Sequence, residues 1–278
     1  MSLVSNTYGK GRVRVMRIKK DGPTHEVREL EVKAMLTGGF AAAFTSHDNS
    51  SVVSTDTVKN VINVVARENI GLDKEDYVFA LTQRFLDRYP QVETVTVTAY
   101  ETKWVRMTIG GKLHPHSFIL DSNGKPFTRA AASRADVTVI SGISGFTFLK
   151  STESGWANYY MDPYTTIKET RDRMCATSME ASWRWAKKPL DYSQSNTKIL
   201  DTMLEVFAST YSESVQDSLY RMGTAALAAV PEVIDISLAC PNKHYLLMNL
   251  EAFGLMNDNA IFLPTDEPHG QIEATITR

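Results

Sequence analysis

The segment Asp48-Asn-Ser-Ser-Val-Val-Ser-Thr-Asp-Thr-Val-Lys-Asn60 marks the point where an extended run ends and a helix begins. Four polar residues crowd positions 54–57, and valine or isoleucine then follows at i, i+3, i+4 and i+7, which predicts an amphipathic helix over 55–69. Only one or two polar residues are needed to cap a helix. The others lie beside free backbone N–H groups at the positive end of the helix dipole, where a small anion can bind. Plain capping is the alternative.

A weak internal duplication appears when the chain is compared with itself at a shift of 141 residues. The shift lays Pro90–Ala99 over Pro231–Cys240, and both segments are proline-led strands with alternating faces. It also lays Thr55 over Asn196, which predicts a second helix cap at Asn196. Identities are few, so chance alignment of two similar units remains the alternative. We expect two domains, 1–135 and 136–278.

Each half is predicted to run β-β-α-α-β-β. The predicted elements of the first half are strands near 11–20, 25–37, 92–106 and 114–121, and helices near 55–69 and 75–88. Those of the second half are strands near 136–150, 172–187, 232–240 and 243–251, and helices near 197–211 and 214–229. The segment 121–134 is interpreted as a connector. This pattern predicts the α+β class, each half having an antiparallel four-stranded sheet with two helices on one face. The open sheet edges suggest that the chain oligomerises.

Composition excludes several classes of protein. The chain has 278 residues, 43% hydrophobic and 22% charged, with a net charge of −2, which is typical of a globular protein and argues against a nucleic-acid partner. The basic run 12–20 alternates like a strand, and we interpret it as a solvated strand face. No apolar run approaches the roughly 20 residues of a membrane span. Cys175 and Cys240 form no disulfide framework, and neither end carries a secretory or peroxisomal signal, so we expect a cytoplasmic protein.

Few residues point to chemistry by pattern alone. His244 lies among polar residues in Pro241-Asn-Lys-His-Tyr245, where the other half has Lys103, although a lone histidine is more often structural. His114 and His116 share a strand face, and Cys175 or Cys240 could complete a metal site. The chain nevertheless lacks the closely paired Cys or His of zinc sites and any phosphate-binding glycine motif. We therefore predict neither a metal nor an organic cofactor.

Short motifs in a fixed order cover nearly the whole chain. They are Tyr8-Gly-Lys10, Asp48-Asn-Ser50, Thr55-Asp-Thr-Val-Lys-Asn60, His114-Pro-His-Ser-Phe118, Leu149-Lys-Ser-Thr152, Tyr164-Thr-Thr-Ile-Lys-Glu-Thr-Arg-Asp-Arg173, Ser214-Val-Gln216 and Pro241-Asn-Lys-His-Tyr245. In content, order and spacing this set resembles the urate oxidase (uricase) family. The resemblance implies two tunnelling-fold (T-fold) domains, whose sheets join into barrels in a homotetramer with active sites between subunits. It also implies catalysis without metal or organic cofactor.

The resemblance assigns roles to individual residues. Lys10, Thr55 and His244 match the residues of the family's proton relay. Asn242 matches the residue whose amide lies over the substrate ring, where dioxygen and then water are held. The remaining matches contact the substrate: the Arg173 and Gln216 side chains grip one purine edge, and the Thr55, Asp56 and Val215 backbones add hydrogen bonds. Trp156 stands where the family usually has a stacking Phe, which puts the placement of the ring in question.

These roles would suit urate, a flat anion that a guanidinium and an amide can bind along one edge. The expected reaction is oxidation by dioxygen and water to 5-hydroxyisourate and hydrogen peroxide. The simpler interpretations are that Lys10 is a solvated lysine before a strand and that Trp156 packs in the core. For the other two, Arg173 pairs with Asp172 or a glutamate on the sheet, and Gln216 serves only as a capping partner of Ser212 or Ser214. The other functional hypotheses are a T-fold enzyme acting on a pterin or purine-like heterocycle, and a non-catalytic purine-binding homologue.

Overall fold

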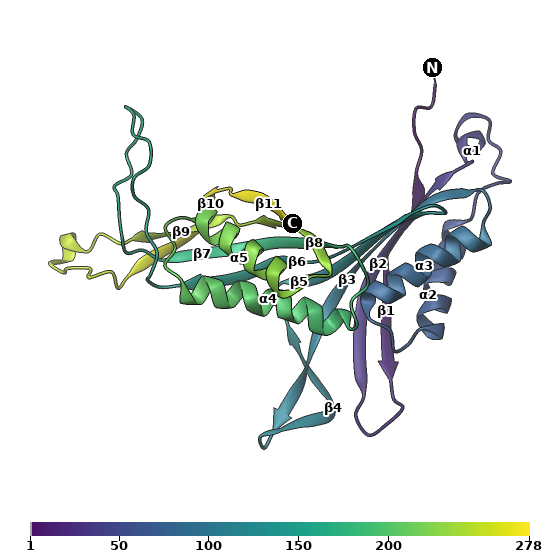
Figure 1. The fold of residues 1–278 in the computed structure, drawn as a ribbon, viewed down its shortest axis with the longest axis horizontal. Coiled ribbons are helices and arrows are strands. Elements are labelled where there is room, and N and C mark those ends of the chain that lie inside the picture. Colours follow the sequence, from purple (N-terminus) through teal and green to yellow (C-terminus); the bar gives the residue numbers. More distant parts are fainter. Residues whose placement is uncertain (1) are drawn as a thin grey trace. The chain divides into compact units, whose positions relative to one another are not determined.

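The computed structural model describes residues 2–278, which form two compact units, 2–142 and 143–278 (Figure 1). Strand β6 (Val137–Lys150) carries the chain from the first unit into the second. The expected domain boundary after residue 135 lies just before this strand and stays a prediction. No helix among residues 2–278 is long and apolar enough to cross a membrane.

The first unit contains an antiparallel sheet in the order β1-β2-β3-β5. Its strands are β1 (Tyr8–Lys19), β2 (Glu26–Gly38), β3 (Val92–Ile109) and β5 (Lys125–Ser133). A further strand, β4 (Lys112–Asp121), pairs only with the outer part of β3, residues 103–109. The outer part of β3 and β4 therefore form a hairpin that extends beyond the four-stranded sheet (Figure 1).

The helices of the first unit are α1 (Ala41–Thr45), α2 (Thr55–Glu68) and α3 (Lys74–Arg88). Val58, Ile62 and Val65 on α2 are fully or almost fully buried, as are Leu81 and Phe85 on α3. They pack against alternate residues of the strands in one core, as the apolar spacing of both helices predicts. Each side chain of this size contributes about 1.5–3 kcal/mol when fully buried.

The second unit is built in a similar way. Its strands beyond β6 are β7 (Cys175–Trp185), β8 (Val233–Ala239), β9 (Asn242–Leu247), β10 (Phe262–Gly270) and β11 (Glu273–Thr277). The sheet runs β6-β7-β8-β11, while β9 pairs with the first residues of β7 and with β10. A short 3-10 helix, η1 (Glu251–Phe253), lies between β9 and β10. The pairing on both sides of β9 fixes the strand that carries Asn242 and His244.

Two helices, α4 (Tyr192–Ser209) and α5 (Val215–Ala229), cover one face of this sheet (Figure 1). Ile199 and Met203 on α4 and Leu219 on α5 are buried. The predicted cap at Asn196 is wrong, because α4 begins earlier, where Asp191 accepts a hydrogen bond from the Gln194 N–H at 2.8 Å. Asn196 lies inside the helix, and its side chain accepts a hydrogen bond from the Trp183 indole at 2.9 Å.

The α+β class is confirmed, but the predicted strand pattern is wrong in three places. The segment 121–134 is more than a connector, because it contains β5, whose Thr128, Ala130 and Ala132 alternate inward. Strand β4 is outside the four-stranded sheet, so the fourth strand of that sheet is β5. Strands β10 and β11 were not predicted, because their residues are largely polar and exposed, and pairing with β9 and β8 sets their conformation.

The basic run 12–20 was predicted to be a solvated strand face, but one of its arginines is buried. Arg17 is only 3% exposed; its guanidinium lies 4.6 Å from the centre of the Tyr77 ring and donates a hydrogen bond to the Asn69 carbonyl at 2.8 Å. Arg12 and Arg14 are solvated, as expected. Burial lowers the pKa of the Arg17 guanidinium, because desolvation disfavours its charged form.

Candidate active site

Lys10 lies beside a β-bulge in strand β1. Lys10 pairs with Ala34 and Val13 pairs with Val32, so two residues of β1 oppose the single residue Lys33 of β2. The second bulged residue, Arg12, has a left-handed φ of 56°. Counted back from the buried Val13 by strict alternation, Lys10 would point away from the core. The extra residue returns Lys10 to the helix-covered face, opposite the fully buried Ala34.

Gly9 allows the close approach of strands β1 and β2 at this point. A Cβ atom at Gly9 would lie 1.9 Å from the Ala34 carbonyl oxygen, a distance that no side chain can occupy. Gly9 therefore holds the backbone of Lys10 closely against β2.

The start of α2 leaves one hydroxyl group uncommitted. Ser54 is the N-cap, and its side chain accepts a hydrogen bond from the Thr57 N–H at 3.0 Å. The Thr57 hydroxyl lies 2.8 Å from that of Ser54, whereas the exposed Thr55 hydroxyl has no partner within the described chain. Capping is thus performed by Ser54, and the Thr55 side chain stays available to a ligand.

Asp56 follows in the first turn of α2 and is held by its own helix. Its carboxylate accepts hydrogen bonds from the Lys59 ammonium and, at 3.1 Å, from the Asn60 amide. The hydrogen bond from Lys59 is the main reason why the pKa of the Asp56 carboxyl is lowered, and the nearby charge of Lys10 lowers it further. Lys10 and the start of α2 therefore lie together in the first unit.

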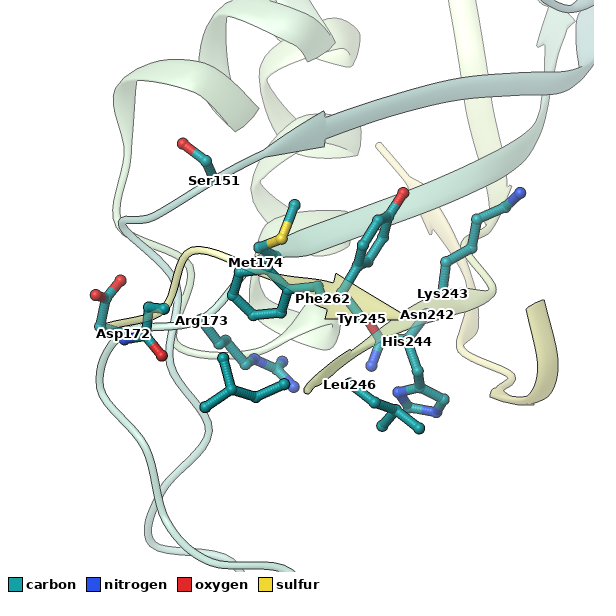
Figure 2. A pocket seen from close by; sticks show the side chains of 12 residues that line it. Ser151, Asp172, Arg173, Met174, Asn242, Lys243, His244, Tyr245, Leu246 and Phe262 are labelled. Carbon is teal, nitrogen blue, oxygen red and sulfur yellow. The ribbon is translucent and has the colours of Figure 1, made fainter. Parts of the chain in front are cut away.

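The second unit holds a pocket of about 240 Å³ beside strand β9 (Figure 2). Its lining includes Arg173, Met174, Asn242, His244 and Phe262. In Figure 2 the Lys243 and Tyr245 side chains point to one side of the strand and that of His244 to the other. The structure thus brings three of the predicted site residues, Arg173, Asn242 and His244, to one cavity.

Arg173 presents a largely desolvated cation to this pocket. Its backbone N–H donates to the Ser154 carbonyl at 2.9 Å, which fixes the start of the side chain. Its Nε atom is buried without a hydrogen-bond partner, and burial lowers the pKa of the guanidinium. The expected alternative, a pair with Asp172, is wrong: across residues 2–278 no carboxylate pairs with Arg173, and Asp172 accepts from the Thr152 hydroxyl instead.

Trp156 and Tyr159 form a two-ring stack next to Arg173. The ring centres of the two residues are 5.3 Å apart and their planes differ by 11°, while the Tyr159 hydroxyl donates to the Ile167 carbonyl at 2.8 Å. The Arg173 guanidinium lies 6.0 Å from the Trp156 ring centre. Trp156 is half-buried and is outside the core, so the interpretation of Trp156 as a core residue is wrong.

The start of α5 is fastened to the segment that carries Trp156. The Ser212 N–H donates to the Glu153 carbonyl and the Gly155 N–H to the Ser212 carbonyl, both at 2.9 Å. Ser214 caps α5 by accepting from the Asp217 N–H at 3.1 Å, so Gln216 is not its capping partner. The Gln216 side chain is exposed, and the first backbone N–H groups of α5, beginning at Val215, have no partner within the helix.

The predicted residues therefore fall into two groups. Lys10, Thr55 and Asp56 belong to the first unit, whereas Trp156, Arg173, Val215, Gln216, Asn242 and His244 belong to the second. Trp156, Val215 and Gln216 lie outside the lining of the pocket itself. Within residues 2–278 no group of three or more His, Cys, Asp or Glu side chains could hold a metal ion.

The candidates for a metal site have other roles. The His114 and His116 rings contact each other edge to face, with centres 4.6 Å apart. Cys175 and Cys240 are free and buried, and burial raises the pKa of the Cys240 thiol to about 12. A thiol with so high a pKa is a poor nucleophile at neutral pH.

Some contributors were missed by the sequence analysis. The Tyr8 hydroxyl accepts a hydrogen bond from the segment before Thr55, and the Tyr159 ring stacks on Trp156. A single tyrosine carries no periodic signal, so neither could be found from the sequence pattern. Phe262 comes from the unpredicted β10, which pairs with β9 so that Thr265 lies opposite His244. The residues of β10 are largely polar and exposed, so no periodic signal in the sequence pointed to this partner strand.

Taken together, the fold and the site define an α+β protein with tandem helix-covered antiparallel sheets. The second unit offers an arginine without an ion-pair partner among residues 2–278, an adjacent aromatic pair, and a pocket lined by Asn242 and His244. Such a set suits a flat, anionic heterocycle, because the guanidinium can bind an edge while the ring stacks on a face. Comparison with known proteins identifies the family.

The uricase family model matches residues 6–131 and 139–273. The chain is 36% identical to a uricase of Dictyostelium discoideum, covering 100% of this chain and 98% of that protein. It is 36% identical to a uricase of Arthrobacter globiformis over 99% of this chain and 90% of that protein. The crystal structure of the Arthrobacter globiformis uricase matches with a TM-score of 0.94, covering 100% of this chain and 95% of that one at 34% identity. The chain belongs to the uricase family.

Proposed function

We propose that this chain oxidises urate with dioxygen and water to 5-hydroxyisourate and hydrogen peroxide, without metal or organic cofactor. Urate oxidation follows from family membership and from similarity over the full length of the chain. The residue roles are the further step. Lys10, Thr55 and His244 form the proton relay, and Arg173 and Gln216 bind one edge of urate.

The observation that carries the substrate assignment is the unpaired, half-buried Arg173 guanidinium. A desolvated cation without a counter-ion favours binding of an anion, because the anion restores the stabilisation lost on leaving water. Trp156, 6.0 Å from this guanidinium, supplies a ring on which a purine can stack. The Thr55, Asp56 and Val215 N–H groups, all at helix starts, complete the binding of a flat anion with polar edges.

The relay residues make urate reactive toward dioxygen. A second deprotonation raises the electron density of the purine enough for it to reduce dioxygen directly. A threonine hydroxyl is a poor base alone, so Lys10 and His244 take and return protons through Thr55. Asn242 holds dioxygen, and then water, over the ring. Urate, dioxygen and water give 5-hydroxyisourate and hydrogen peroxide in a balanced reaction.

The active form in this proposal is a homotetramer with each site between two subunits. Two observations support it: the site residues are divided between the two units, and apolar side chains are exposed on extended strands. Leu113, Ile119 and Leu120 on β4 are each more than half exposed. A lone subunit would leave this surface in water, which favours association. We place the protein in the cytoplasm, where Cys175 and Cys240 would remain reduced.

The experiment that tests the function mixes EDTA-treated protein with urate in air. Urate absorbance, oxygen consumption and peroxide release are followed together, with boiled protein as the control. We expect one dioxygen consumed and one peroxide formed for each urate lost, at the same rate with and without EDTA. Failure to consume urate would refute the activity. Strong inhibition by EDTA would favour a metal-dependent T-fold enzyme of the pterin type.

A further inference from the structure

The segment that leads into the relay threonine is tied to the strand that carries the relay lysine by a tyrosine hydroxyl. The Val53 N–H donates a hydrogen bond to the Tyr8 Oη atom at 2.9 Å. Tyr8 lies two residues before Lys10 on β1, and Val53 lies two residues before Thr55 at the start of α2. One hydrogen bond thus joins the two backbones just before each reaches its relay residue.

The Tyr8 ring is itself fixed in place. It contacts Phe40 edge to face, with ring centres 4.8 Å apart, and packs against the core of the first unit. Phe40 is fully buried. Tyr8 pairs with Leu36 on β2, and Gly9 beside it lets the two strands approach closely. The hydroxyl is therefore presented to Val53 by a rigid support.

The hydrogen bonds that precede Val53 in this segment lie farther from Thr55. The Val52 N–H donates to the Asn49 carbonyl at 3.0 Å, and the Gln91 side chain donates to the Ser51 carbonyl at 2.9 Å. Between those bonds and the Ser54 cap, the Val53 N–H is fastened by Tyr8. Val53 is 5% exposed, so its N–H would have no easy access to water if the hydroxyl were removed.

We propose that Tyr8 is a positioning residue, which holds Thr55 in register with Lys10 so that the two can exchange a proton. The inference rests on the proposed function, because it concerns the same relay. Proton transfer requires donor and acceptor within hydrogen-bond reach, and a displacement of about 1 Å can cost a hundredfold in rate. Burial raises the pKa of the Tyr8 phenol, so Tyr8 itself stays protonated at neutral pH and acts through position.

The Tyr8→Phe variant tests this inference because it keeps the ring and the Phe40 contact and removes only the hydroxyl. We expect kcat to fall about ten- to a hundredfold. Urate binding, measured without oxygen so that no turnover occurs, should weaken much less than kcat falls, because Arg173 and Gln216 lie in the other unit and only the Thr55 and Asp56 N–H contacts are displaced. The matched control is Tyr77→Phe, which removes a hydroxyl that donates to the Ile62 carbonyl at 2.9 Å in the same unit. That control should lose stability and keep its kcat.

Hydrogen exchange of the segment 51–57 provides a second measurement that does not depend on activity. The Val53 amide should exchange faster in Tyr8→Phe than in the wild type, and at an unchanged rate in Tyr77→Phe. Unchanged protection of Val53, or a normal kcat in Tyr8→Phe beside an active wild type, would refute the positioning role alone. A wild type that leaves urate untouched would refute the proposed function and the inference with it.

Discussion

Replacing Arg173 with glutamine should change stability in opposite directions with and without urate. In the free protein, Arg173 has a buried Nε without a partner and no ion pair within the described residues. A buried donor left unsatisfied costs about 1–3 kcal/mol. The contact with Trp156 at 6.0 Å returns about 0.5–1 kcal/mol. Glutamine removes both, so the free variant should be more stable by about 1 kcal/mol, or by about 2–4 °C in Tm for a domain of this size.

Urate binding, by contrast, should be weakened by the same substitution. A hydrogen bond to a charged group contributes about 1.5–3 kcal/mol, so loss of the guanidinium should weaken urate binding about ten- to a hundredfold. At a urate concentration of about 100 times the wild-type Kd, the wild type gains about 2.7 kcal/mol of stability. A variant that binds about a hundredfold more weakly gains only about 0.4 kcal/mol at that concentration. The order of the two Tm values should therefore reverse when urate is added.

Thermal unfolding without oxygen, with and without urate, measures this reversal directly. Calorimetric titration gives the two Kd values independently. The control variant is Arg171→Gln, which removes an exposed arginine from the same segment and should change neither Tm nor Kd. The reasoning is wrong if Arg173→Gln is less stable than the wild type in the absence of urate. It is equally wrong if urate stabilises both proteins by the same amount.

Three further results are expected. Lys10→Met and Thr55→Ala should each lower kcat by about 10²–10⁴-fold while urate still binds in the absence of oxygen, and near-normal turnover in either would remove that residue from the relay. Arg12→Gly should keep the stability of the wild type, because glycine accepts the φ of 56°. Arg12→Val should lose about 1–2 kcal/mol of unfolding free energy, measured with denaturant. Equal stabilities of the two variants would contradict the strain at the bulge. Trp156→Ala should weaken urate binding by about 1–3 kcal/mol, whereas Trp156→Phe should bind urate within about threefold of the wild type. Similar losses of affinity in both variants would argue against stacking.

The local pattern of the chain was enough to predict much of the fold. The four long helices were predicted from apolar spacing, because one buried face repeats every 3.6 residues whatever the partner is. Strands β1, β2, β7 and β8 were found from alternation. Strand β5 was not, because its run of alanines has low β-propensity and its conformation comes from pairing with β3.

The candidate site, too, was predicted only in part from the sequence. The order and spacing of short motifs were sufficient to name the family and to nominate residues such as Lys10, Thr55 and Arg173. Alternation alone, however, would put Lys10 with Arg12 and Arg14 on the solvated face of β1. Only pairing with β2 reveals the bulge that turns Lys10 toward α2, since a bulge is defined by two residues that oppose one on another strand.

Burial and partnership were likewise decided by the tertiary structure. The sequence supplied an arginine next to Asp172, but within residues 2–278 the fold leaves its guanidinium without a counter-ion, and Asp172 accepts from Thr152. The sequence placed Tyr8 and Val53 45 residues apart, and the fold joined them by one hydrogen bond. Periodicity reports which face of its own element a residue occupies. The group that meets that face belongs to another part of the chain, so only the packed structure can supply it.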